Sequence, residues 1–247
     1  MLIDLIVHCF RFSRVLNYQL SSLVHYSAWP AEVSITIFYD PDDQPTTDVI
    51  NHFRPDVTIA AWALPRRQLL RREIGRNLAA HQTAADVVWF ADADYYFGDG
   101  CLSALAGTPL ADGMIHFPRK QQISKTHKLG DIYALRAKSP GLYDVNPADF
   151  QTERIRKAIG GLQIVTGDTA RKHGYCDGCK VQTEVDPANG WVTTLGDQVY
   201  RGESGLNCGK GTPIDLPNLY RIRQSQQGVV DELPIPAGDQ RGQIGIA

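Results

Sequence analysis

The sequence lacks a long apolar run, a surplus of basic residues and a cysteine-rich pattern. With no run of about 18 apolar residues, no segment is expected to span a membrane. A formal net charge of −2 gives no electrostatic reason to expect nucleic acid as a partner. Residues 1–7 carry no basic leader, and the five cysteines are an odd number. We therefore expect a reducing cytoplasm rather than a disulfide-bonded secreted protein.

The composition is that of a globular protein with a sizeable core, since 43% of the 247 residues are hydrophobic and 21% are charged. A chain of this length suits one large α/β domain, which we place at residues 1–225. Residues 226–247 are rich in Gly, Pro and Gln and are predicted to be a polar, loosely held tail.

Strand-like and helix-like segments alternate in the first half of the chain. Apolar runs predict strands at 2–10, 32–39, 57–63 and 87–90, and helical spacing predicts helices at 14–27, 47–53 and 65–82. This order predicts a Rossmann-type, mostly parallel sheet flanked by helices.

The pattern becomes irregular after Leu105. We expect strands at 113–118, 162–165 and 219–225, a helix from Asp149 to Ile159, and a short helix from Thr166. The polar, basic segment 119–138 is interpreted as a mobile or acceptor-facing region.

Two carboxylates end the apolar strand 87–90. Asp92 and Asp94 are one residue apart, so strand alternation points both side chains the same way. Burying bare carboxylates is costly, which places them at the open end of the strand, where α/β sheets bind ligands. Oxygen ligands in this arrangement suit Mg²⁺ or Mn²⁺. An Asp-rich turn without a metal is the simpler alternative.

The same region carries a resemblance to a known family. The segment Gly75-Arg76-Asn77, the strand 85–90 and Asp92-Ala93-Asp94 together resemble the nucleotide-sugar half of a GT-A glycosyltransferase, nearest the family 2 type. The resemblance implies a GT-A-like fold with an irregular C-terminal acceptor region. It is best over residues 2–105 and thin afterwards.

The resemblance implies donor-binding roles for residues near the strand ends. Phe10 would offer a ring to the base, and Asp40, with Asp42 and Asp43 close behind, would bind uracil or ribose. The alternative for these acidic residues is a turn after a strand. Arg76 would hold the Asp92 and Asp94 carboxylates or the diphosphate; at least three of the five arginines of segment 65–82 are expected to form a solvated face.

The resemblance also implies a catalytic base near residue 197. Inverting members carry an acidic pair there, and Asp197 resembles its second residue, whereas the first is Gly196. Such a base takes the proton of the attacking hydroxyl. Asp197 as a plain helix cap is the alternative, and Glu203 and Asp168 are further candidates. The strand 219–225 has arginines but not the metal-binding His of many relatives, so an Arg would partly replace the cation or the metal would have fewer protein ligands.

A separate cysteine cluster matches no feature of that family. His173, Cys176 and Cys179, with Cys208, have spacing compatible with a structural Cys₃His zinc site. Unpaired thiols in a loop are the alternative, and Cys9 and Cys101 are expected in the core.

The resemblance, together with Asp92 and Asp94, thus implies a metal-dependent, inverting glycosyltransferase. It would move a sugar from a nucleotide-diphosphate donor, expected to be a UDP-sugar, to a hydroxyl of a glycan or glycoconjugate, with Mn²⁺ or Mg²⁺ held by Asp94 and Asp92. Alternatives are a retaining transferase, a nucleotidyltransferase, which would normally have glycine after the first strand, and an inactive glycan- or protein-binding module.

Overall fold

The structure, a computed structural model, describes residues 1–26, 28–177, 185–186, 190–191, 196–203, 206 and 209–225. In the first half the elements are β1 (Leu2–Cys9), α1 (Ser13–His25), β2 (Glu32–Tyr39), α2 (Gln44–Phe53), β3 (Thr58–Ala63), α3 (Arg66–Leu69), α4 (Arg72–Gln82), β4 (Val87–Phe90), β5 (Tyr95–Phe97) and α5 (Cys101–Ala106). In the second half they are β6 (His116–Pro118), β7 (Lys120–Ser124), α6 (His127–Arg136), the 3₁₀ turn Pro147–Asp149, β8 (Phe150–Arg154), β9 (Gln163–Thr166), α7 (Gly167–His173), β10 (Val185–Asp186), β11 (Gly190–Trp191), α8 (Gly196–Glu203), β12 (Thr212–Ile214) and β13 (Leu219–Arg221).

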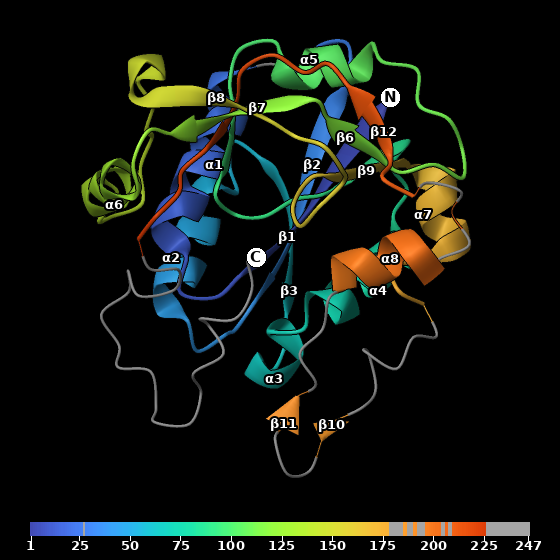
Figure 1. Ribbon diagram of the computed structural model, residues 1–247. Helices are drawn as coiled ribbons and strands as arrows, with labels where there is room; N and C mark the ends of the chain where they lie inside the picture. Colours follow the sequence, from blue (N-terminus) through green and yellow to red (C-terminus); the bar gives the residue numbers. More distant parts are fainter. Residues whose placement is uncertain are drawn as a thin grey trace.

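A seven-stranded sheet in the order β12-β6-β9-β4-β1-β2-β3 forms the centre of the fold. Strands β4, β1, β2 and β3 are parallel, and β9 runs antiparallel to both β4 and β6. Right-handed crossovers place α1 and α2 on one face of the sheet and α4 on the other. Figure 1 shows α1 and α2 on the side opposite α4, α7 and α8. The mostly parallel sheet predicted from the sequence is therefore confirmed.

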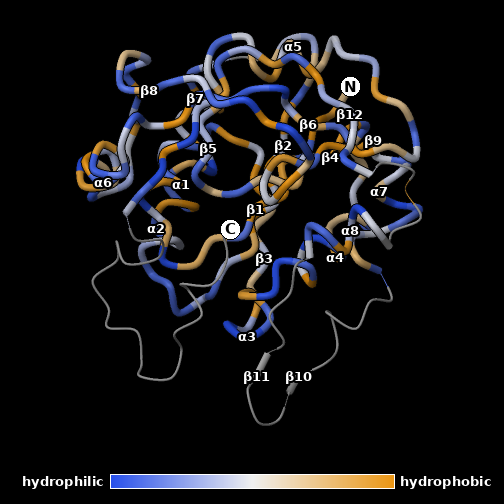
Figure 2. Tube along the Cα trace, in the orientation of Figure 1, coloured by the Kyte–Doolittle hydropathy of each residue, from blue (hydrophilic) through white to orange (hydrophobic). Residues whose placement is uncertain are grey.

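The core lies where the central strands are covered on both faces. All four residues of β4 are buried, and Ile3, Leu5, Ile6 and Val7 of β1 are fully buried. Figure 2 shows hydrophobic residues concentrated in β1, β2 and β4. Parallel strands that are covered on both faces are continuously apolar, which explains why these strands were recognised from the sequence.

A second sheet, in the order β5-β13-β7-β8, corrects two sequence predictions. The segment 119–138 contains strand β7 and helix α6, so of its two interpretations the mobile one is wrong, and the acceptor-facing one stays a prediction. The helix predicted from Asp149 is wrong, because Phe150–Arg154 is strand β8, paired antiparallel with β7. In Figure 1 this second sheet and α6 lie beside α1.

The structure leaves the predictions on the tail and on the domain boundary untested. The predicted tail 226–247 lies outside the described residues, and the single-domain assignment stays a prediction. Among the helices that the structure describes, none is long and apolar enough to cross a bilayer.

Candidate donor site

The candidate site forms at the edge of the central sheet where β1, β2 and β4 end. Because these strands are parallel, their carboxyl ends meet at one edge. Phe10 follows β1, Asp40 follows β2, and Asp92 and Asp94 follow β4. Strand β9 is antiparallel to β4, with Gln163 opposite Phe90, so the loop that precedes β9 returns to the same edge.

Asp92 lies between two guanidinium groups from α4. Its Oδ1 is 2.6 Å from Arg72 Nη1 and 3.3 Å from Arg76 Nη2. The two arginines differ in exposure, since the Arg72 side chain is 41% exposed and that of Arg76 is 2% exposed. Burial tends to raise the pKa of Asp92, but Arg72, Arg76 and Arg221 hold it below its ordinary value. Asp92 is therefore a charged carboxylate.

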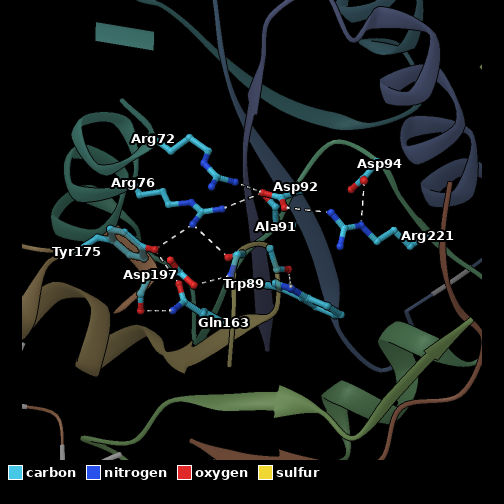
Figure 3. A network of polar contacts seen from close by, with 12 residues as sticks. Arg72, Arg76, Trp89, Ala91, Asp92, Asp94, Gln163, Tyr175, Asp197 and Arg221 are labelled. Atoms are coloured by element: carbon cyan, nitrogen blue, oxygen red, sulfur yellow. Dashed lines mark hydrogen bonds and ion pairs between the residues drawn. The ribbon is translucent and has the colours of Figure 1, made fainter. Parts of the chain in front are cut away.

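Asp94 is held by an arginine from the second sheet. Arg221 Nε donates to Asp94 Oδ2 at 2.9 Å, and Arg221 Nη2 lies 4.0 Å from Asp92 Oδ2 (Figure 3). Strand β13 brings Arg221 there by pairing with β5, where Arg221 is opposite Tyr95. Burial raises the pKa of Asp94; Arg221 opposes that rise and Asp92 adds to it.

Arg76 is the buried arginine of the site and contacts four different groups. It donates to Asp92, to the Ala91 carbonyl at 3.3 Å, to the Gly160 carbonyl at 3.2 Å and to the Tyr175 hydroxyl at 2.9 Å. Of the two predicted roles, the geometry brings Arg76 to the carboxylate. Arg72 is the guanidinium that faces solvent beside Asp92 and can reach an anion there.

The Gly160–Gly161 loop passes against Asp92. A Cβ atom on Gly161 would lie 2.5 Å from the Asp92 nitrogen and 2.7 Å from its Cγ, so only glycine fits at this approach. The Gly161 carbonyl accepts a hydrogen bond from Trp89 Nε1 at 2.8 Å, which anchors the loop to β4.

Asp197 joins the same network from the first turn of α8. Its Oδ2 accepts from the Gly160 nitrogen at 3.3 Å, and its carbonyl accepts from Gln163 Nε2 at 3.3 Å. Gln163 Oε1 in turn accepts from the hydroxyl of Tyr175, which Arg76 contacts (Figure 3). One residue, Gly160, thus bridges Arg76 and Asp197 through its carbonyl and its nitrogen, so the structure brings Asp197 to the Asp92 centre.

Phe10 lines a cleft of about 560 Å³, and Asp40 lies behind the lining residue Arg66. The lining of the cleft includes Phe10, Asp42, Asp43 and Arg66. Asp40 is buried and its Oδ2 is 3.1 Å from Arg66 Nε, while the Arg66 guanidinium lies 5.0 Å from the Phe10 ring centroid. The side chains expected to contact the nucleoside therefore meet around Arg66.

Asp43 has a structural role at this cleft. Its side chain accepts hydrogen bonds from the Arg11 nitrogen at 2.7 Å and the Thr46 hydroxyl at 2.8 Å. It also caps the first turn of α2. Asp43 is therefore committed to holding the chain at this turn.

The two further candidates for a base have different positions. Asp168 lies in the first turn of α7, near the amino end of β4 and thus at the opposite edge of the sheet, where it pairs with Arg171 at 2.5 Å. The side chain of Glu203 lies outside the described residues. Of the two candidates whose side chains are described, only Asp197 lies at the Asp92 centre.

The proposed zinc ligands are only partly described. His173 ends α7, and the buried Cys176 Sγ donates to the Gly196 carbonyl at 3.2 Å. Cys179 and Cys208 lie outside the described residues. Within the residues that the structure describes, no group of three His, Cys, Asp or Glu side chains is placed to hold a metal. Structural zinc stays a prediction, and Cys9 and Cys101 are buried as expected.

The Asp92–Asp94 pair has one feature that fits a divalent cation. Within the described part of the chain, Asp94 Oδ1 is buried and has no hydrogen-bond partner. A carboxylate oxygen is a ligand that Mg²⁺ and Mn²⁺ prefer. Asp92 Oδ1 already accepts from two arginines. The residues therefore fit a cation held chiefly by Asp94.

Sequence reasoning missed part of this centre. The sequence predicted that an arginine of strand 219–225 would partly replace the charge of the cation. No local pattern indicates that this arginine is Arg221 or that it reaches Asp94, 127 positions earlier. Tyr175 and Gln163 also lacked a signal. The helical spacing of Arg72 and Arg76 could have assigned both to Asp92, because residues four apart share a helix face.

Comparison with known proteins gives structural likeness only. No protein-family model matches the sequence, and no curated protein matches it. The chain is similar to S. aureus TarS, with a TM-score of 0.56 at 14% identity over 90% of this chain and 36% of TarS. The TarS fragment 1–349, solved in complex with UDP-GlcNAc, has a TM-score of 0.52 at 14% identity, over 95% of this chain and 62% of the fragment.

A weaker likeness, with a TM-score of 0.49 at 11% identity, is to the bifunctional glycosyltransferase WbbM, over 86% of this chain and 38% of WbbM. The chain thus spans 36% to 62% of these structures. The likeness to TarS confirms the predicted α/β fold.

Proposed function

We propose that the protein is a nucleotide-sugar glycosyltransferase that uses a UDP-sugar and a divalent cation. The observation that carries this proposal is the centre at the end of β4, where two carboxylates meet three guanidiniums and Asp94 Oδ1 is left without a partner among the described residues. The fold supports the proposal, because TarS, which shares it, has been solved with UDP and with UDP-GlcNAc.

The charges of the centre suit a diphosphate. The guanidinium groups of Arg72, Arg76 and Arg221 lie around Asp92 and Asp94, so cationic groups are present where a diphosphate would bind. Arg72 is half-exposed and would contact the diphosphate, while Asp94 would hold Mn²⁺ or Mg²⁺ with Asp92 beside it. When bound, the cation would neutralise charge that develops on the leaving diphosphate.

The nucleoside would occupy the cleft at the ends of β1 and β2. Phe10 would lie against the base, and Asp40 would hold the ribose or uracil from its position beside Arg66. The sugar would then extend along the same sheet edge toward Gly160 and Asp197. The centre is too polar and too charged for an apolar ligand.

The transfer that this arrangement supports is a single displacement with inversion. The acceptor hydroxyl oxygen attacks the anomeric carbon while the bond from that carbon to the diphosphate oxygen breaks. The Asp197 carboxylate takes the hydroxyl proton, and the nucleoside diphosphate leaves. Asp197 suits this role because the Gly160 nitrogen orients one of its oxygens toward the Asp92 centre. The acceptor is proposed to be a glycan or glycoconjugate.

Calorimetry with a panel of nucleotide diphosphates and UDP-sugars tests the proposal. With Mn²⁺ present, the wild type should bind one nucleotide class, and Asp94→Asn should lose that binding. Asp168→Asn is the matched control, because it makes the same chemical change on an exposed carboxylate at the opposite sheet edge. The proposal fails if the wild type binds no nucleotide, or if both variants bind like the wild type.

A further inference from the structure

A glutamate from α4 occupies the space in front of Gly196. A Cβ atom built on Gly196 would lie 1.9 Å from Glu73 Oε1 and 2.6 Å from Glu73 Cδ and Cγ. The Glu73 side chain therefore lies directly against the start of α8, where Asp197 follows. No other residue type fits at position 196 while Glu73 keeps this position.

The Glu73 carboxylate is buried among charged groups of the candidate site. Glu73 is 6% exposed and lies in the first turn of α4, next to Arg72. A buried carboxylate is costly unless nearby charges compensate it, and Glu73 interacts electrostatically with the guanidinium groups of Arg71 and Arg72. The charges of Asp92, Glu73 and Asp197 all act on the guanidinium of Arg72. Glu73 thus belongs to the same electrostatic centre as Asp197.

We infer that Glu73 supplies, from α4, the carboxylate that residue 196 does not carry, and that it is a positioning residue for Asp197. The acidic pair before α8 is then formed in space by Glu73 and Asp197 rather than by neighbours in the sequence. Glu73 would fix the first turn of α8, so that Asp197 meets the Gly160 nitrogen and faces the acceptor side of the donor sugar. This inference rests on the proposed function.

The kinetic test uses hydrolysis of the UDP-sugar that the wild type binds, with water as acceptor. Asp197→Asn should lower kcat by about 10²–10⁴-fold. Glu73→Gln keeps the shape of the side chain and removes its charge, and it should lower kcat by about a hundredfold with donor KM unchanged. Glu73→Asp should recover part of this loss. Glu32→Gln, at an exposed position where β2 begins, is the matched control.

The double variant shows whether Glu73 acts through Asp197. Glu73→Gln should cause no further loss of kcat in the Asp197→Asn background, because a residue that only positions another has nothing left to position. Equal losses in both backgrounds would overturn the inference, and so would wild-type kcat in Glu73→Gln.

A second arm requires no nucleotide. Gly196→Ala should lower the melting temperature, since its Cβ collides with Glu73, and Glu73→Ala/Gly196→Ala should regain much of that loss. If Gly196→Ala melts at the wild-type temperature, Glu73 does not lie against α8 and the inference falls. If this arm holds but the wild type binds no UDP-sugar, the proposed function is what fails.

Discussion

Removal of the Arg221 side chain tests the charge balance of the centre. Arg221→Met keeps a side chain of similar length against the Tyr95 ring, which lies 5.5 Å from the guanidinium carbon, but removes the cation. Asp94 then loses the only side-chain donor that contacts it among the described residues. The loss is severe because the side chains of Arg221 and Asp94 are only 13% and 7% exposed.

The expected cost follows from that burial. Removing one partner of a buried ion pair costs about 3–5 kcal/mol, because the other charge stays buried without compensation. For a chain of this size each kcal/mol lowers the melting temperature by about 2–4 °C, so Arg221→Met should melt roughly 6–20 °C below the wild type. The double variant Asp94→Asn/Arg221→Met should lose less, since neither charge then remains alone.

The assay is chemical and thermal unfolding at pH 7 in the absence of divalent cations. Arg119→Met is the matched control: it removes an arginine whose ion pair with Asp215 is exposed, with side chains 47% and 72% accessible, so it should cost at most about 1 kcal/mol. If Arg221→Met and Arg119→Met cost the same, Arg221 does not neutralise a buried Asp94 and the argument is wrong.

Three further predictions concern the elements around the centre. Gly161→Ala should lower stability by about 1–3 kcal/mol and abolish nucleotide binding, because its Cβ collides with the Asp92 backbone; calorimetry and unfolding check this. Asp43→Ala should cost about 1–2 kcal/mol in urea unfolding, since it removes the cap of α2. Burial raises the pKa of Asp4 in the folded state above its ordinary value of 3.8, so folding favours the protonated form. The stability of the wild type relative to Asp4→Asn should therefore be greatest below that value and fall as the pH rises through the raised pKa; a flat difference would contradict it.

The first half of the fold was predictable because its signals are local. Strands β1, β2 and β4 are apolar runs separated by helices with apolar positions three to four residues apart, so both type and order could be assigned. One detail differed: the predicted helix 65–82 is two helices, α3 and α4, interrupted at residues 70–71. Helix α4 therefore begins at Arg72, beside Asp92.

The second sheet was not predictable in the same way. Strand β8 is polar, and Phe150, Ile155 and Ile159 happen to have spacing that also suits a helix. Its strand conformation depends on pairing with β7, about thirty residues earlier, as in Gln121 opposite Glu153. Propensity and pattern do not report such non-local pairing.

The residues of the site also differ in whether the local sequence could predict them. Asp92 and Asp94 could be proposed from one short segment, because a buried strand that ends in two carboxylates is unusual. Arg221 and Glu73 could not, since each reaches the centre through tertiary packing with a distant segment. Arg72 was visible as a helix-face neighbour of Arg76, but only the fold shows that one is exposed and the other buried.

The most direct test of the central claim is the titration of UDP into the wild-type protein, followed by calorimetry, first with Mn²⁺ and then with a chelator. The account predicts saturable binding of one UDP per chain with Mn²⁺ and binding at least about tenfold weaker with the chelator, because Asp94 and the cation together hold the diphosphate. Absence of binding in Mn²⁺, or equal affinity in both solutions, would contradict the claim that the Asp92–Asp94 centre is a metal-assisted nucleotide site.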